Sequence, residues 1–153
     1  MIMKKTNKGF SLVELIIVIA IMAILAGALA PALIKYINKS RGSAAISNSQ
    51  QIASAIQTAL SNESVFDDST DQQSAITYAS FMGGTTNAKL IAEIKKTLGS
   101  KYTHKAKKDF KGNTVSQDYW IAFKVATSEV DVWAGVQDAD HMVYPTIGDA
   151  WTD

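Results

Sequence analysis

The sequence predicts an α+β protein in which a long N-terminal helix, apolar in its first half and amphipathic in its second, packs on a small antiparallel β-sheet. Three observations carry this prediction. An apolar run extends to Ile34, a 3.6-residue repeat of apolar positions continues over residues 35–61, and short segments with alternating apolar positions follow nearer the C-terminal end. The 153 residues leave room for one domain beyond the helix.

The first predicted element is an apolar run that follows a leader containing three lysines. Twenty residues without a charge, from Leu15 to Ile34, are enough for a helix that spans a bilayer core of about 30 Å. Glu14 lies inside the apolar run, which starts at Phe10. A charge in a membrane-spanning helix costs about 2.5–3.5 kcal/mol on insertion scales, so we expect Glu14 to be a functional residue that meets a positive charge.

The helix is expected to continue to Ser61, because residues 35–61 place apolar side chains on one face and Ser, Asn and Gln on the other. A helix from Phe10 to Ser61 is too long for the rest of the chain to bury, so its first half must contact lipid or other helices. The apolar face of the second half consists of Ile37, Ala45, Ile52, Ile56, Ala59 and Leu60.

The region after the long helix begins with a polar loop over residues 63–71, beyond Asn62. Residues 72–81 are predicted to form a short helix that ends before a pair of glycines. Residues 87–98 are predicted to form another helix, with Asn87 as its N-cap and Gly99 as its end, because apolar positions recur between them at helical spacing.

Two strands are predicted next, over residues 118–126 and 129–136, because apolar side chains alternate along both segments. The short link Thr127-Ser128 favours an antiparallel hairpin. A third strand is expected near residues 141–147. The core-facing positions of the two hairpin strands are Tyr119, Ile121, Phe123, Val125, Val130, Val132, Ala134 and Val136.

The segment Gly9-Phe10-Ser11-Leu12-Val13-Glu14, after its lysine-rich leader, resembles the N-terminal signal of type IV pilins and pseudopilins. In that family a prepilin peptidase cuts after the glycine and methylates the new N-terminal amine. The resemblance implies cleavage between Gly9 and Phe10, N-methylation of Phe10, and a role of Glu14 in assembly. It covers about the first 50–60 residues by pattern.

The resemblance also implies a division of the chain and a pilin fold. Residues 1–9 would be the leader peptide removed by prepilin peptidase, residues 10–34 the transmembrane and filament-core helix, and residues 35–61 the amphipathic half of the same helix. Residues 62–153 would form the globular α+β head.

The apolar run has two other interpretations, a secretory signal and a plain membrane anchor. An ordinary secretory signal would use Ala28-Leu29-Ala30 for cleavage, but Pro31 would then be the first mature residue, and Glu14 would interrupt the apolar core of the signal. A plain membrane anchor is compatible with the precursor but leaves Gly9-Phe10 and Glu14 unexplained. The lysine and arginine counts on the two sides of the run are nearly equal, so the orientation rests on the resemblance.

Gly27 and Pro31 weaken the helix within its apolar half, because proline donates no backbone hydrogen bond and glycine costs about 1 kcal/mol relative to alanine. From the residues alone, the pair predicts either a simple kink or a site of close helix packing. The family resemblance adds a third interpretation, which is local unwinding when the filament assembles.

The resemblance predicts a structural subunit, the major pilin, of a type IV pilus that serves motility, adhesion or biofilm formation. The alternative is a major-type pseudopilin of a type II secretion or competence system. The expected partners are other copies in a helical filament, the prepilin peptidase, the pilus assembly machinery and, before assembly, membrane lipid. The expected location is the cytoplasmic membrane, with a single pass and the N-terminus inside, and then an extracellular pilus.

Charge is divided unevenly along the second half of the chain. Eight lysines lie between residues 89 and 111, whereas residues after Gly112 carry seven carboxylates and a single lysine. The two regions are either solvated faces or complementary patches that meet between neighbouring subunits. Nucleic acid is a disfavoured partner, because only two aromatic residues, Tyr102 and Phe110, lie near the lysines in the sequence for bases to stack on.

No catalytic constellation is predicted, so the chain is not expected to be an enzyme or to need a cofactor. The chain has no cysteine, which departs from the disulfide-closed C-terminal region of many pilins. No metal site is assigned; the weak candidate for Ca²⁺ is the group Asp138, Asp140 and Asp149, since carboxylates at alternating positions can converge on a hard cation. Ser11 and Glu14 fit the capping box of a helix start.

Overall fold

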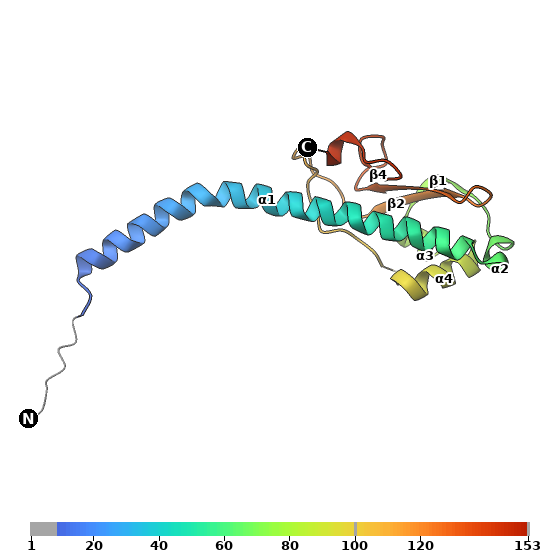
Figure 1. The fold of residues 1–153 in the computed structure, drawn as a ribbon, viewed down its shortest axis with the longest axis horizontal. Helices are drawn as coiled ribbons and strands as arrows, with labels where there is room; N and C mark the ends of the chain where they lie inside the picture. The colour runs from blue at the N-terminus through green and yellow to red at the C-terminus, as the bar shows by residue number, and fades with distance from the viewer. Residues whose placement is uncertain (1–8, 100, 153) are drawn as a thin grey trace, which may run out of the picture. The chain divides into compact units, whose positions relative to one another are not determined.

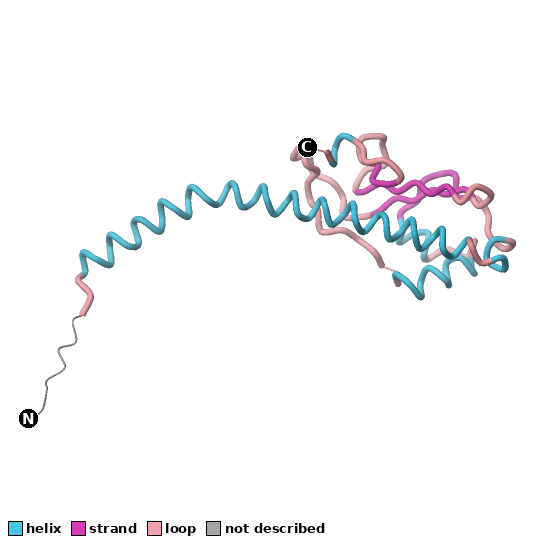
Figure 2. The backbone as a smooth tube through the Cα atoms, viewed as in Figure 1, coloured by secondary structure: helices cyan, strands magenta, loops and turns pink. Residues whose placement is uncertain are grey.

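The structure is a computed structural model that describes residues 9–99 and 101–152. Its main element is α1, a helix of 49 residues over Leu12–Leu60 (Figures 1 and 2). The contacts within the chain divide it into two units, the first ending at Tyr36 and the second beginning at Ile37. The predicted α+β class, with a long helix and a small antiparallel sheet, is confirmed.

The described part of the first unit is the apolar half of α1 and the three residues before it, Gly9, Phe10 and Ser11. Every residue from 9 to 36 is exposed. In the described part of the chain, α1 is the helix that is long and apolar enough to cross a membrane. No residue in its most apolar stretch is buried. The helix assignment continues through Gly27 and Pro31 without interruption.

The second unit contains the sheet, which has the strand order β1-β2-β3-β4 with antiparallel pairing throughout. The strands are β1 Gln72–Thr77, β2 Tyr119–Lys124, β3 Glu129–Ala134 and β4 Met142–Tyr144. The predicted hairpin is confirmed, since β2 and β3 pair from Tyr119 opposite Ala134 to Lys124 opposite Glu129. The expected third strand corresponds to β4 and is shorter than predicted.

The second half of α1 packs on this sheet (Figure 1). Tyr119 Oη donates a hydrogen bond of 2.8 Å to the carbonyl oxygen of Ala45, which ties β2 to the helix. Gln57 Nε2 donates to the carbonyl oxygen of Ser128 at 3.2 Å, which ties the hairpin loop to the same helix. The predicted apolar face is buried except for Ile37, which lies at the boundary of the two units and is 39% exposed.

The remaining helices are α2 Glu63–Phe66, α3 Tyr78–Met82, α4 Ala88–Leu98 and a 3-10 turn, η1, over Asp149–Trp151. The prediction of a loop over residues 63–71 was wrong in its first part, which forms α2. Asn62 caps α2 by accepting a hydrogen bond of 3.1 Å from the Ser64 N–H, and Val65 turns into the core.

The predicted helix over residues 72–81 was wrong in its first half. That half is β1, which pairs with β2 through an irregular register between Gln72 and Ile76, and the helix α3 starts only after Thr77. β1 is the edge strand of the sheet and has little apolar alternation of its own, so pairing with β2 decides its conformation over local preference.

The predicted bounds of α4 and the N-cap position of Asn87 are confirmed, but the Asn87 side chain does not cap the helix. Asn87 occupies the N-cap position with a left-handed backbone, φ 61°, and makes no side-chain cap hydrogen bond. Its amide instead binds the backbone of Thr70, accepting from the Thr70 N–H at 2.6 Å and donating to the Thr70 carbonyl at 3.1 Å. Gly99 ends the helix with φ 79°, as predicted.

The predicted core faces of β2 and β3 are confirmed over the length of the strands. Val136 was placed on that face but is 41% exposed. β3 ends at Ala134, because Gly135 takes a positive φ of 90° and turns the chain away. A Cβ on Gly135 would lie 2.6 Å from Val115 Cβ, so the turn also depends on the small residue.

Noncovalent contacts hold the C-terminal segment in place in this chain without cysteine. The Phe110 N–H donates to the carbonyl of Ala150 at 2.9 Å, and Trp151 is buried. His141 Nδ1 lies 2.7 Å from Asp138 Oδ1, and His141 Nε2 lies 3.6 Å from Oδ2 of the buried Asp109. These contacts join the segment around Asp109 and Phe110 to the C-terminal segment after residue 137.

Candidate assembly site at the start of the N-terminal helix

The start of α1 is organised by Ser11 and Glu14. The Ser11 N–H donates a hydrogen bond of 2.8 Å to Glu14 Oε2, and the Val13 N–H donates one of 3.3 Å to Ser11 Oγ. This reciprocal arrangement is a capping box, which satisfies N–H groups that have no partner within the helix. The sequence-based prediction of a capping box is confirmed.

The capping box fixes where the Glu14 carboxylate lies. Its oxygen bonds the N–H of the residue directly after Phe10, so the charge stands at the first turn of the helix, where the helix dipole favours an anion. Gly9 and Phe10 lie before the helix in no regular secondary structure, and the Phe10 side chain is 87% exposed. The leader lysines at positions 4, 5 and 8 lie outside the described residues.

The helix behind this carboxylate presents a continuous apolar surface. From Leu12 to Ile34 its large aliphatic side chains are between 43% and 73% exposed. A surface of this extent is not left in water by a stable monomeric protein, so it needs lipid or other apolar helices around it. Glu14 is the charged residue at the end of that surface.

The three carboxylates considered for Ca²⁺ are not brought together. Within residues 9–99 and 101–152, no group of three His, Asp or Glu residues is placed to hold a metal ion. Asp138 instead accepts from the backbone and ring of His141, and the backbone carbonyl of Asp140 accepts from the Ala150 N–H at 3.0 Å. Asp149 begins the turn η1. The candidate metal site therefore has no support in the geometry.

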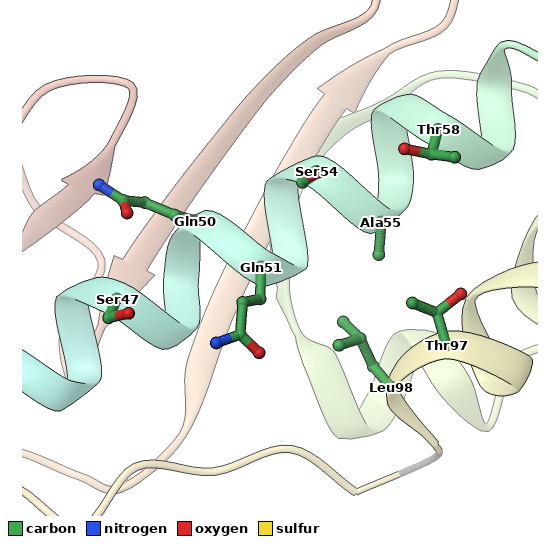
Figure 3. A pocket seen from close by; sticks show the side chains of 8 residues that line it. All are labelled: Ser47, Gln50, Gln51, Ser54, Ala55, Thr58, Thr97 and Leu98. Carbon is green, nitrogen blue, oxygen red and sulfur yellow. The ribbon is translucent and has the colours of Figure 1, made fainter.

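A groove of about 480 Å³ lies between the second half of α1 and the end of α4 (Figure 3). Its lining carries hydroxyl and amide groups and no charged side chain, which gives it hydrogen-bonding capacity but no acid, base or nucleophile activated by a partner. Its lining residues are Ser47, Gln50, Gln51, Ser54, Ala55, Thr58, Thr97 and Leu98.

Sequence reasoning missed the contacts that fix the head. Gly42 is one example: a Cβ there would overlap the Phe110 ring and lie 3.1 Å from Trp151 Cζ3. His141 is another, since its two carboxylate neighbours lie 3 and 32 positions away in the sequence. No local signal marks either position, because both contacts depend on how distant segments pack.

Comparison with known proteins bears on the same N-terminal segment. The family model of the prokaryotic N-terminal methylation motif matches residues 4–30. Two type IV major fimbrial proteins FimA from Dichelobacter nodosus are 45% identical to the chain over 58 residues, which is 38% of this chain and 37% and 36% of the two relatives. The match thus spans less than half of the relatives' length. No solved structure is significantly similar to the chain.

The methylation motif, the fimbrial relatives and the α+β fold together support a type IV pilin. The predicted resemblance is confirmed for the N-terminal segment. The head beyond that segment is described by the structure alone.

Proposed function

We propose that the chain is a structural subunit, the major pilin, of a type IV pilus. One observation carries the proposal: an exposed apolar helix begins with a carboxylate, Glu14, that bonds the N–H of Ser11, next to Phe10. After cleavage behind Gly9, the Phe10 nitrogen becomes the terminal amine of the chain. The carboxylate is then bonded to the residue next to that positive charge in its own subunit, and it lies at the surface that other subunits would contact.

Processing comes first in this proposal. The prepilin peptidase cuts between Gly9 and Phe10 and methylates the Phe10 amine. The exposed position of both residues ahead of the helix supports access to the bond. Methylation leaves the amine basic, so it keeps its positive charge at neutral pH.

Assembly uses the apolar half of α1. Before assembly this half lies in the cytoplasmic membrane as a single pass, with the leader inside and the head outside. The assembly machinery then transfers the subunit into a bundle of Phe10–Ile34 helices, where Glu14 pairs with its own Phe10 amine or with that of a neighbour. An opposite charge within about 4–6 Å offsets the cost of burying the carboxylate.

The same pair selects the register of the subunits. A buried carboxylate without its partner costs about 3–5 kcal/mol, so a subunit that enters out of register is rejected. Gly27 and Pro31 lie in the last third of the bundled segment. There, a missing hydrogen bond and a residue without a side chain allow the helix to unwind locally and the filament to stretch.

The proposed roles of the fibre are motility, adhesion and biofilm formation. The test is electron microscopy of sheared surface material, probed with an antibody against the head. Long fibres that bind the antibody along their length support the major pilin. Label confined to the membrane fraction, with no fibre present, would contradict it.

The alternative is a major-type pseudopilin of a type II secretion or competence system. An oxygen-rich Ca²⁺ site in the C-terminal region would favour it, and in the described part of the chain the candidate carboxylates Asp138, Asp140 and Asp149 do not converge. The matched relatives are fimbrial proteins, which supports the pilus instead.

A further inference from the structure

The outer face of the sheet carries a small acidic pocket near the β2–β3 hairpin. The register places Ala122 opposite Asp131 and Lys124 opposite Glu129 on this face. The small side chain of Ala122 leaves a hollow of about 220 Å³ between the longer side chains. We call this the acidic pocket; its lining residues are Gln72, Gln73, Ala122, Phe123, Lys124, Glu129 and Asp131.

The charges of the acidic pocket are not balanced. Lys124 Nζ lies 2.8 Å from Glu129 Oε2, so these two groups neutralise each other. Asp131 is partly buried, and among the described residues no hydrogen bond or ion pair reaches its carboxylate. Burial, and then the neighbouring Glu129, raise the pKa of Asp131 above its ordinary value. A cation that entered the pocket would stabilise the charged form of the Asp131 carboxylate.

A row of unpaired lysines lies on another part of the head. Residues 101–107 are extended and alternate: Tyr102, His104 and Ala106 turn inward, while Lys101, Lys105 and Lys107 are exposed. The segment is anchored beside the start of β2, because Thr103 pairs with Asp118 and the His104 N–H donates to the Gln117 carbonyl at 3.0 Å. We call Lys101, Lys105 and Lys107 the lysine row.

No ion pair is recorded for the lysine row within the described chain, although Asp118 lies opposite Thr103 in the same segment. Lys89, Lys96 and Lys124 form ion pairs with carboxylates, and in the described chain no such pair involves the lysine row. The row lies beside Asp118, before β2 begins, and the acidic pocket lies at the other end of β2, around Lys124. The head therefore carries two complementary charged surfaces at different places.

We propose that the lysine row of one subunit docks on the acidic pocket of a second copy of this chain. The inference rests on the proposed function, because it supplies a contact between heads in the same filament. Two different surfaces that bind each other form a head-to-tail contact, which repeats into an open helical assembly when the rotation between copies does not close. Charge complementarity of this kind sets register and specificity more than affinity.

Charge reversal tests the proposal in cells that produce the full chain. Asp131→Lys is expected to lower the yield of sheared fibres about fivefold or more, because it brings like charges together. Combining it with Lys105→Glu and Lys107→Glu is expected to restore much of the yield. Asp67→Lys, which makes the same change of net charge at an exposed residue beside α2, is the matched control and is expected to leave the yield unchanged.

Cysteine pairs give a direct readout, because the chain has no cysteine of its own. Fibres of the double variants Asp131→Cys with Lys105→Cys, and Asp131→Cys with Lys107→Cys, are expected to yield a ladder of linked subunits after mild oxidation. Each single variant should remain monomeric under the same conditions.

Several outcomes would overturn the inference. Normal fibres from Asp131→Lys, or oxidised fibres without a ladder, would show that the two surfaces do not meet while leaving the proposed function intact. Salt-sensitive binding of DNA by the purified full chain that is lost in Lys105→Glu, with normal fibre yield, would assign the lysine row to nucleic acid. No fibre from the unaltered chain would overturn both proposals.

Discussion

The two halves of α1 belong to one continuous helix but meet different surroundings. The half before Tyr36 is exposed at every described position, whereas the second half buries Ala45, Ile52 and Ile56 completely. The two halves differ in composition, since the first is almost wholly apolar and the second also carries Ser, Asn and Gln. Apolar side chains therefore surround the first half but occupy only one face of the second.

Glycines in the two halves show the consequence. A Cβ on Gly27 would have no atom within 4 Å, whereas a Cβ on Gly42 would overlap Phe110. The first half leaves its surface open for lipid or for other copies, and the second has already used its surface within the subunit. In the proposed filament, one helix thus serves assembly at one end and folding at the other.

The largest expected effect concerns the exposed half. Glu14→Ala removes the carboxylate that the proposed filament pairs with the Phe10 amine, so we expect normal insertion and cleavage but no fibres in electron micrographs. Glu63→Ala is the matched control, because Glu63 also lies in the first turn of a helix but in the head. Normal fibres from Glu14→Ala would contradict the proposed assembly mechanism.

Processing is expected to fail when Gly9 is enlarged. In Gly9→Val a β-branched side chain stands at the proposed cleavage position, so the full-length precursor should accumulate and be visible as a slower band on a gel. Mass spectrometry of the mature chain provides the companion measurement, with methylated Phe10 as the expected N-terminus. A mature chain that starts elsewhere would refute the assignment of Gly9 and Phe10.

The packed half is expected to respond to Gly42→Val. The added side chain meets Phe110 and Trp151, and overpacking of this kind costs about 1–3 kcal/mol of unfolding free energy. Urea denaturation of the detergent-solubilised chain measures it. Gly27→Ala is the control and should not lower the stability of the head. Equal effects of the two substitutions would contradict the division of α1.

Acid should weaken the head through His104. Its ring is buried beside Tyr119 and Trp151, and this burial lowers the pKa of His104 from its ordinary value. The unfolded chain therefore takes up a proton more readily than the folded one. Stability is complete above about pH 6.5 and falls as the pH drops below it, by at most about 1.4 kcal/mol per pH unit for this group.

The measurement is the midpoint of urea unfolding between pH 7.5 and 5. His104→Phe keeps an aromatic ring in the same site and cannot be protonated, so it should flatten the pH dependence in this range. An unchanged slope in that variant would mean that another group is responsible.

Most of the fold was predictable from patterns of residues that lie close together in the sequence. The apolar run, the amphipathic continuation, the hairpin around Thr127-Ser128 and the capping pair of Ser11 and Glu14 are encoded by residues close together in the sequence. The predictions were wrong where a partner distant in the sequence decides the local conformation. Gln72–Thr77 is a strand because β2 pairs with it, and the Asn87 side chain binds Thr70 instead of capping α4.

The sequence by itself determined the start of the helix, its apolar character and the motif that supports a type IV pilin, since each depends on side chains within a few turns of one another. Tertiary structure alone decided how the head is held without a disulfide: His141 between Asp138 and Asp109, and Trp151 against Gly42. It also separated the lysine row from the acidic pocket. Apart from the local pair of Asp138 and His141, these contacts join residues that are distant in the sequence, and their geometry exists only once the chain has packed.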